Sequence, residues 1–275
     1  MRQRLRDENG FTLVEALVVL VVTSLLVTFV LRFHVLQNKE YDLQGQISFL
    51  QKNVRSAMEA MEEEIRMAGS GFPAGALASS VDIIDSGTDS DEIVVMRAVP
   101  GVRAVLTETM PNPSAELKCD DVSGFEEGWA VIADEVGSET FLITHVQDQA
   151  DHLQHNTMTF SRPFEAGSWV IQASYRQYCI DRESDPEHPK LVLRDYDGSD
   201  QIVAENIDDI QFAYVLEDFS ETPTPPADMD EVIMVRISIV GRTARADPSF
   251  PGDGYRRREL ITRVKLRNFH LKKGI

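Results

Sequence analysis

The chain has 275 residues and a formal net charge of −18, with 27 basic and 45 acidic side chains. A surface of this charge repels the phosphates of nucleic acids and anionic membrane surfaces, so nucleic-acid binding is not expected. The length is enough for a sizeable core in one domain or in two smaller ones, and no internal repeat is evident.

The N-terminus joins a short charged leader, MRQRLRDENG, to a long apolar run. Residues 11–31 are 21 residues with a single charged side chain, that of Glu15. As a helix, this run spans ~31 Å, close to the ~30 Å hydrocarbon core of a bilayer. Because Arg2, Arg4 and Arg6 precede the run, the positive-inside rule predicts a cytoplasmic N-terminus and an exported remainder.

Placing an ionisable side chain such as Glu15 inside a membrane costs free energy, so Glu15 is expected to have a charged partner. Such a residue is by default a candidate functional site. A secretory signal is the competing interpretation of the apolar run. It requires a small-residue cleavage site after the run, but residues 31–34 read LRFH. Cleavage is therefore expected before the run, between Gly10 and Phe11, where it creates a cationic α-amino group that can pair with Glu15.

Residues 10–15, GFTLVE, resemble the prepilin signature of type IV pilins and type II secretion pseudopilins. The resemblance covers roughly the first thirty residues. It implies that a membrane aspartyl peptidase cuts after Gly10 and methylates the amine of Phe11. It also implies that the Glu15 carboxylate meets the Phe11 amine of a neighbouring subunit and sets the register between subunits. The alternative is a plain membrane anchor that tolerates a glutamate.

An amphipathic helix is predicted to continue from the apolar run, because apolar residues recur there at steps of three or four. They are Leu43, Ile47, Leu50, Val54, Met58, Met61 and Ile65. Gly69, Gly71 and Pro73 form a stop signal, and no proline precedes Pro73. An unbroken helix over residues 11–68 is therefore expected. The predicted organisation is a cleaved leader (1–10), a transmembrane helix (11–31), an amphipathic periplasmic helix (32–70) and a β-rich domain (71–275).

Short strands are predicted beyond Pro73, where runs of Val, Ile and aromatic residues lie between turn clusters. Residues 134–138, DEVGS, predict a hairpin turn, and the proline-rich residues 221–226 predict an exposed loop. The expected fold class is α+β, with the long helix packed on an antiparallel sheet as in pilins. The predicted strands are 92–99, 128–134, 139–146, 157–162, 169–180, 190–194, 203–216, 231–242 and 259–269.

Two segments of the C-terminal half resemble a narrower group. Residues 203–214, VAENIDDIQFAY, and residues 263–269, RVKLRNF, are similar to segments of PilW-type minor pilins and of J-type pseudopilins. The chain also looks larger than the abundant shaft pilins, and its first helix lacks their helix-breaking proline. These features indicate a low-copy assembly or tip subunit.

Candidate catalytic and metal-binding residues are few. His145, Asp148, Asp151, His152 and His155 cluster within residues 144–156, and two of these histidines with a carboxylate could hold a metal. A polar loop between strands is the favoured interpretation. Residues 85–92, DSGTDSDE, could bind Ca²⁺ but lack the full EF-hand spacing, so a solvated acidic turn is favoured. No nucleophile elbow, phosphate loop or zinc-protease motif is present, so neither an enzyme nor a cofactor is expected.

Two cysteines, Cys119 and Cys179, fall on the exported side with 59 residues between them. An oxidising compartment favours a disulfide there, and closing so long a loop would stabilise the fold by about 4 kcal/mol. Two buried free thiols are the alternative, and the sequence does not choose between them.

The sequence therefore predicts a non-catalytic, PilW-like minor pilin that primes or caps type IV pilus assembly. Its expected partners are other minor pilins, major pilin subunits, the prepilin peptidase and the inner-membrane assembly platform. The expected location is the inner membrane, through a single span with a periplasmic domain, and then the pilus fibre or tip. One alternative is a J-type minor pseudopilin of type II secretion, and the other is a membrane-tethered periplasmic hydrolase.

Overall fold

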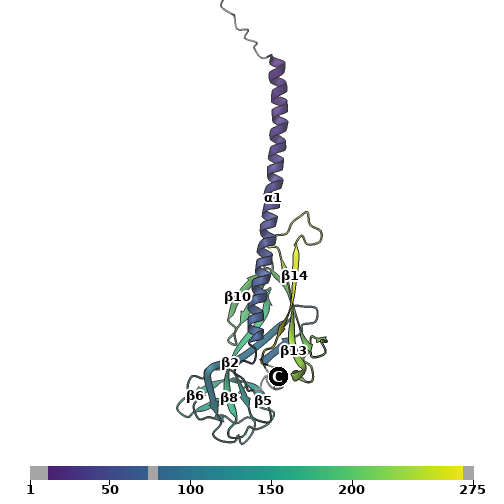
Figure 1. Ribbon diagram of the computed structural model, residues 1–275. Helices are drawn as coiled ribbons and strands as arrows, with labels where there is room; N and C mark the ends of the chain where they lie inside the picture. Colours follow the sequence, from purple (N-terminus) through teal and green to yellow (C-terminus); the bar gives the residue numbers. More distant parts are fainter. Residues whose placement is uncertain (1–11, 74–79, 269–275) are drawn as a thin grey trace, which may run out of the picture. The chain divides into compact units, whose positions relative to one another are not determined.

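The computed structural model describes residues 12–73 and 80–268, which form one long helix followed by antiparallel strands (Figure 1). This arrangement confirms the predicted α+β class. The chain divides into two compact units, Met1–Ser48 and Phe49–Ile275. Helix α1 runs through both units, and every strand lies in the second.

Helix α1 spans Leu13–Arg66, 54 residues that contain no proline. The predicted helix ran two residues further at each end. The chain turns out of the helix at Gly69 and Gly71, whose φ angles of 71° and 82° are left-handed and favour glycine. The main chain then bonds directly to a strand, because Gly69 N donates to Met96 O at 2.9 Å. The glycine and proline stop signal therefore ends the helix within two residues of the predicted position.

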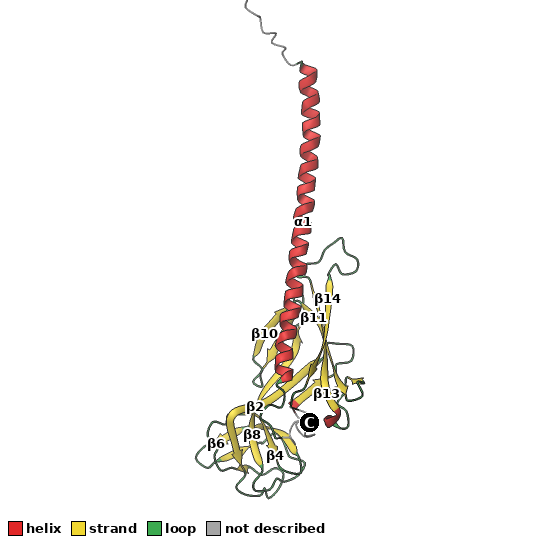
Figure 2. Cartoon of the chain, in the orientation of Figure 1, coloured by secondary structure: helices red, strands yellow, loops and turns green. Residues whose placement is uncertain are grey.

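Two larger sheets and one small sheet make up the second unit (Figure 2). The seven-stranded sheet runs β1 (Val81–Ile84), β2 (Glu92–Val105), β8 (Trp169–Asp181), β4 (Gly128–Ala133) and β5 (Ser138–Ile143), with β9 (Lys190–Arg194) and β10 (Asp200–Glu205) added beside β8. The four-stranded sheet runs β12 (Glu221–Thr222), β11 (Ile207–Leu216), β13 (Val232–Arg242) and β14 (Arg257–Lys265). The small sheet runs β3 (Leu117–Lys118), β7 (His152–Gln154) and β6 (His145–Gln147), and a 3₁₀ turn, η2, spans Met229–Glu231.

The second unit contains two hydrophobic cores. The first core joins the C-terminal part of α1 to strands of both larger sheets. From the helix it buries Leu50, Val54, Ala57, Met58, Met61 and Ile65, most of the predicted apolar stripe. The second core consists of buried residues between Ala104 and Val170, with Phe141, Phe160 and Phe164 among its aromatic side chains. Strands β2 and β8 contribute to both cores, so they connect the two.

Most of the predicted strands are observed with small shifts at their ends. The predicted hairpin is confirmed, since Ala133 pairs with Ser138 at the turn between β4 and β5. The predicted strand 139–146 divides into β5 and β6, and the predicted strand 203–216 divides at Asn206, whose φ is 58°. The short strands β1, β3 and β7 were not predicted. Residues 221–226 were predicted as a loop, but their first two residues form the short edge strand β12.

The predicted strand at residues 157–162 is wrong. The segment is irregular, and its Phe160 side chain packs in the second core although the segment joins no ladder. Phe160 N donates to Pro113 O at 3.2 Å, and Ser161 N donates to the Glu139 carboxylate at 2.9 Å. These isolated partners replace a strand neighbour, so the β propensity of the segment does not determine its backbone conformation.

Gly241 lies where β13 packs closely against α1. A Cβ atom at this position would lie 2.4 Å from Val54 Cγ2 and 2.7 Å from Leu50 Cδ1. Both distances are shorter than van der Waals contact, and the two neighbours are buried in the first core. Only glycine therefore lets β13 pack this closely on the helix.

Gly241→Ala should lower the free energy of unfolding by about 1–3 kcal/mol, because an inserted methyl group forces the packed core apart. Denaturant unfolding of the full-length protein in detergent, followed by circular dichroism of the β-rich unit, measures the change. Gly45→Ala is the matched control, since nothing lies within 4 Å of its added Cβ. Equal stability of Gly241→Ala and wild type would contradict the close packing.

Candidate functional site

The N-terminal end of α1 carries the predicted assembly residue, Glu15. The predicted processing residues, Gly10 and Phe11, lie outside the described residues. Thr12 is the first described residue and directly precedes the helix. Its carbonyl oxygen accepts a hydrogen bond from Ala16 N at 3.1 Å. Thr12 is therefore the N-cap of α1.

Thr12 and Glu15 form a reciprocal capping box. Thr12 N and Thr12 Oγ1 both donate to Glu15 Oε2, at 2.9 and 2.8 Å. Glu15 N lies 3.3 Å from Thr12 Oγ1 and donates to it. The pair satisfies main-chain N–H groups that a helix start leaves without partners. Glu15 is also solvent-exposed in the single chain, so a second partner can reach it.

Thr12 was not identified as a site residue from the sequence. The signal was present, because Thr12-Leu13-Val14-Glu15 has the T-x-x-E spacing of a capping box. Glu15 therefore has a local role in capping α1, in addition to the subunit pairing that the resemblance implies. Within one chain the Glu15 carboxylate has neutral hydrogen-bond donors, but none of these contacts supplies a positive charge.

The helix surface beyond Glu15 is apolar and exposed. Helix α1 is long and apolar enough to cross a membrane, and none of its most apolar 18-residue window is buried within the chain. The polar side chains in this stretch bond to their own helix: Thr23 Oγ1 donates to Val19 O, Ser24 Oγ to Val21 O and Thr28 Oγ1 to Ser24 O, at 2.7–2.8 Å. Hydroxyls satisfied in this way are tolerated in lipid. The helix is thus consistent with membrane anchoring.

A family model described as the prokaryotic N-terminal methylation motif matches residues 5–31. This range contains Gly10, Phe11, the capping pair and the apolar part of the helix. The match supports a type IV prepilin-like protein with an N-terminal methylation motif, and together with the apolar helix it is consistent with membrane anchoring. A comparison with curated proteins finds no relative that matches.

The histidine cluster does not form a metal site in the described residues, where no group of three or more metal-ligating side chains converges. His145 Nδ1 lies 3.7 Å from Glu127, and His152 Nδ1 lies 3.3 Å from Glu116. Both ring nitrogens of His155 contact main-chain carbonyl oxygens. Asp148 lies in an exposed turn after β6. The structure therefore separates the four candidates and gives each histidine a different partner.

The acidic segment 85–92 connects β1 with β2. Asp85 Oδ1 accepts from Gly87 N at 2.8 Å, as in an ordinary Asx turn. Asp91 is buried, and its two oxygens accept from Ser86 N and Phe212 N at 3.2 and 2.9 Å. Asp91 thus links the start of β2 to β11.

The segments that resemble PilW-type proteins hold parts of the second unit together. In the first segment, Asp208 pairs with Arg242 at 3.3 Å and with Arg257 at 2.5 Å, and Tyr214 Oη accepts from Ile83 N at 2.9 Å. In the second segment, Asn268 Nδ2 donates to Ala68 O at 2.7 Å, directly after the helix. Described residues of both segments therefore make structural contacts within the second unit.

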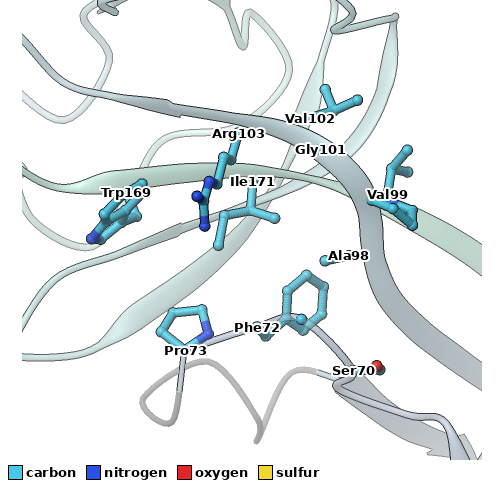
Figure 3. Close-up of a pocket in the computed structure, with 12 residues that line it drawn as sticks. Ser70, Phe72, Pro73, Ala98, Val99, Gly101, Val102, Arg103, Trp169 and Ile171 are labelled. Atoms are coloured by element: carbon cyan, nitrogen blue, oxygen red, sulfur yellow. The ribbon is translucent and has the colours of Figure 1, made fainter.

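One pocket in the second unit has a volume of about 700 Å³ (Figure 3). It lies between the turn after α1, the bulged middle of β2 and the start of β8. Phe72, Pro73 and Ile171 line it, and the Arg103 guanidinium lies 5.3 Å from the centroid of the Trp169 ring. Among the described residues, its lining includes one hydroxyl, that of Ser70, but no histidine, carboxylate or thiol.

Cys119 and Cys179 are both buried free thiols, the second of the two alternatives that the sequence left open. Cys119 belongs to the second core, and Cys179 lies in β8 opposite Val192. Burial raises the pKa of the Cys119 thiol to about 12, with help from Asp120 and Asp151, and it raises the pKa of Cys179 to about 11. Since the thiolate is the reactive form, neither cysteine is a reactive nucleophile.

Neither thiol should react with iodoacetamide in the folded protein at pH 8, and both should react fully once denaturant exposes them. Intact-mass measurement before and after unfolding, without reductant, counts the modified thiols. A disulfide-linked pair of peptides, or rapid modification of the folded protein, would contradict this expectation.

Proposed function

We propose that this chain is a PilW-like minor type IV pilin that, after prepilin peptidase cleavage, primes or caps pilus assembly. The observation that carries the proposal is Glu15, an exposed carboxylate in the otherwise apolar first part of α1, five positions after the leader's last residue. The methylation-motif match over residues 5–31 supports the same function. The two C-terminal segments and the large β-rich unit favour a minor subunit.

In this proposal the peptidase cuts between Gly10 and Phe11 and methylates the new amine. Before assembly, the chain is anchored in the inner membrane with its N-terminus cytoplasmic and its β-rich unit periplasmic. Glu15 then pairs with the Phe11 amine of an adjacent subunit, which provides the charge that Thr12 cannot. Its partners are other minor pilins, the major pilin and the assembly platform, and the mature chain acts without catalysis or a cofactor.

Processing gives the first test. Mass spectrometry of the chain from cells with an active prepilin peptidase should find Phe11 at the N-terminus, with a methylated amine. Gly10→Val should block cleavage, because a branched side chain crowds the scissile bond. An intact leader on the wild-type chain in those cells would refute the proposal.

Assembly gives the second test. Glu15→Ala should be inserted and cleaved normally, because losing a charge eases insertion, but it should fail to join its partner subunits. Glu15→Gln should be nearly as defective, because the amide keeps the shape and loses the charge. Thr12→Val is the matched control: it removes the hydroxyl contacts but keeps the carboxylate, so assembly should be better than in Glu15→Ala.

Co-purification from detergent extracts, with identification of the bound subunits, measures this assembly. Wild-type levels of complex with Glu15→Ala would mean that Glu15 does not set the register. The bound subunits also decide the kind of fibre: pilus subunits support the minor pilin, and secretion pseudopilins would assign the chain to the J-type alternative.

A further inference from the structure

Strand β14 is an open edge of the four-stranded sheet (Figure 2). It pairs with β13 over its full length of 9 residues, in a register without a shift, and no other described strand pairs with it. It contains neither a proline nor a bulge. Natural proteins commonly shorten, bend or cover such edges, because their unpaired main-chain groups bind other strands. A long, regular and open edge therefore calls for a reason.

The other edges of the two larger sheets are less suited to pairing. Within the described part of the chain, β14 is the longest edge strand of these sheets. At the opposite end of the same sheet, β12 has two residues, and at an edge of the seven-stranded sheet β1 has four. A further edge strand, β10, is interrupted by a register shift between Ile202 and Ala204. The features that blunt an edge are present at these strands and absent from β14.

The direction of the main-chain groups of β14 follows from the contacts at its two ends. Arg256 O accepts from Thr243 N at 3.0 Å, and Leu266 N donates to Ile233 O at 3.2 Å, so both residues face the β13 side. In a regular antiparallel ladder, residues of one parity face the neighbouring strand and those of the other parity face away. The odd-numbered residues of β14 therefore direct their N–H and C=O groups to the open edge. They are Arg257, Glu259, Ile261, Arg263 and Lys265.

Two apolar side chains are exposed at the centre of the strand. Leu260 is 38% exposed and Ile261 is 51% exposed. Successive side chains of a strand point to opposite faces of the sheet, so the edge is apolar on both faces at this point. Leu260 lies opposite Ile239, which is buried in the first core. A strand added beside β14 would cover both exposed side chains.

The charge of β14 is opposite to that of the whole chain. The strand has four Arg and Lys residues and one glutamate, whereas the chain has a formal net charge of −18. Arg257 and Arg263 have acidic partners within the chain. No described residue pairs with the side chains of Arg258 and Lys265, which lie near opposite ends of the strand. The edge therefore offers unpaired positive charges on both sides of an apolar centre.

We propose that β14 is a docking edge for an extended, acidic segment of a partner protein, which adds a fifth strand to this sheet. The outward main-chain groups of Glu259, Ile261 and Arg263 would supply the hydrogen bonds. Asp and Glu near the ends of the added segment would pair with Arg258 and Lys265, and apolar residues in its centre would cover the exposed side chains. A second copy of β14 is a poorer occupant, because it brings the same excess of positive charge. The proposal does not depend on Glu15 or on cleavage of the leader.

A peptide with these features tests the edge. The probe is a fluorescent peptide of the same length as β14, with Asp and Glu at both ends and alternating Val and Thr between them. Fluorescence anisotropy with the full-length protein in detergent micelles should show saturable binding that weakens as salt is added. A peptide with Lys in place of every Asp and Glu is the control and should not bind. Absence of saturable binding by the acidic peptide would overturn the proposal.

A proline substitution separates strand addition from attraction between charges. Ile261→Pro removes an outward-facing N–H but no hydrogen bond of the ladder with β13, so the sheet should persist. It should weaken peptide binding by about tenfold or more, because the added strand loses a main-chain donor and meets the proline ring. Ile261→Val keeps the N–H and should bind as wild type does. Equal binding by Ile261→Pro and Ile261→Val, with circular dichroism unchanged, would exclude strand addition.

A charge reversal gives a second variant test, which does not alter the main chain. Arg258→Glu combined with Lys265→Glu should also weaken binding by about tenfold or more. Lys52→Glu combined with Arg55→Glu is the matched control, since it changes the net charge equally on the exposed face of α1 and should leave binding unchanged. Equal loss in both double variants would mean that net charge, and not β14, attracts the peptide.

Hydrogen exchange of the wild-type protein tests the same edge without any substitution. With residue-level resolution, the amides of Glu259, Ile261 and Arg263 should exchange rapidly in the free chain and become protected when the peptide is bound. The amides of Leu260 and Thr262 face β13 and should be protected in both states. Bound peptide without new protection at the odd-numbered positions would place it elsewhere. Sedimentation that shows a dimer dependent on β14, without peptide binding, would assign the edge to a second copy and overturn the proposal.

Discussion

The packing of one face of α1 against strands of both larger sheets is the contact on which the β-rich unit depends. Buried apolar side chains from Leu50 to Ile65 lie on that face, while Lys52, Arg55 and Glu59 remain exposed on the other. Gly241 allows β13 to approach within contact of Leu50 and Val54. Strands of both larger sheets share the core that this helix completes, so neither sheet buries its apolar face without it.

Buried polar contacts fix the relative positions of strands and helix, which apolar packing alone does not determine. Asp91 accepts from Phe212 N and so ties β2 to β11, and Ile83 N donates to the Tyr214 hydroxyl. Asn268 bonds a carbonyl just beyond the helix end. Each contact satisfies a main-chain group that burial would otherwise leave without water, and each has a geometry that only one arrangement of strands fulfils.

The long helix and most strands could be predicted because their signals are local. A stripe at steps of three and four places Leu50 and Val54 on one face, and Gly69 and Gly71 mark the end. The second core could not be foreseen, because its irregular segment 155–160 is held by partners from distant parts of the chain. The partners of His145, His152 and His155 could not be predicted either, because proximity in sequence does not show whether a ring faces a carboxylate or a main-chain carbonyl.

Under the proposed function, the capping box explains how the Glu15 carboxylate could serve both a single subunit in the membrane and an assembled one. Two hydrogen bonds from Thr12 satisfy one Glu15 oxygen, Oε2, while the chain is alone, which lowers the free-energy cost of holding a carboxylate in lipid. Neutral donors do not remove the net charge, so an unpaired Glu15 still gains from meeting a cation. A fully neutralised carboxylate would have no preference for one neighbour over another. In the proposed assembly, this incomplete compensation within one chain leaves a driving force for pairing Glu15 with the charged N-terminus of an adjacent subunit.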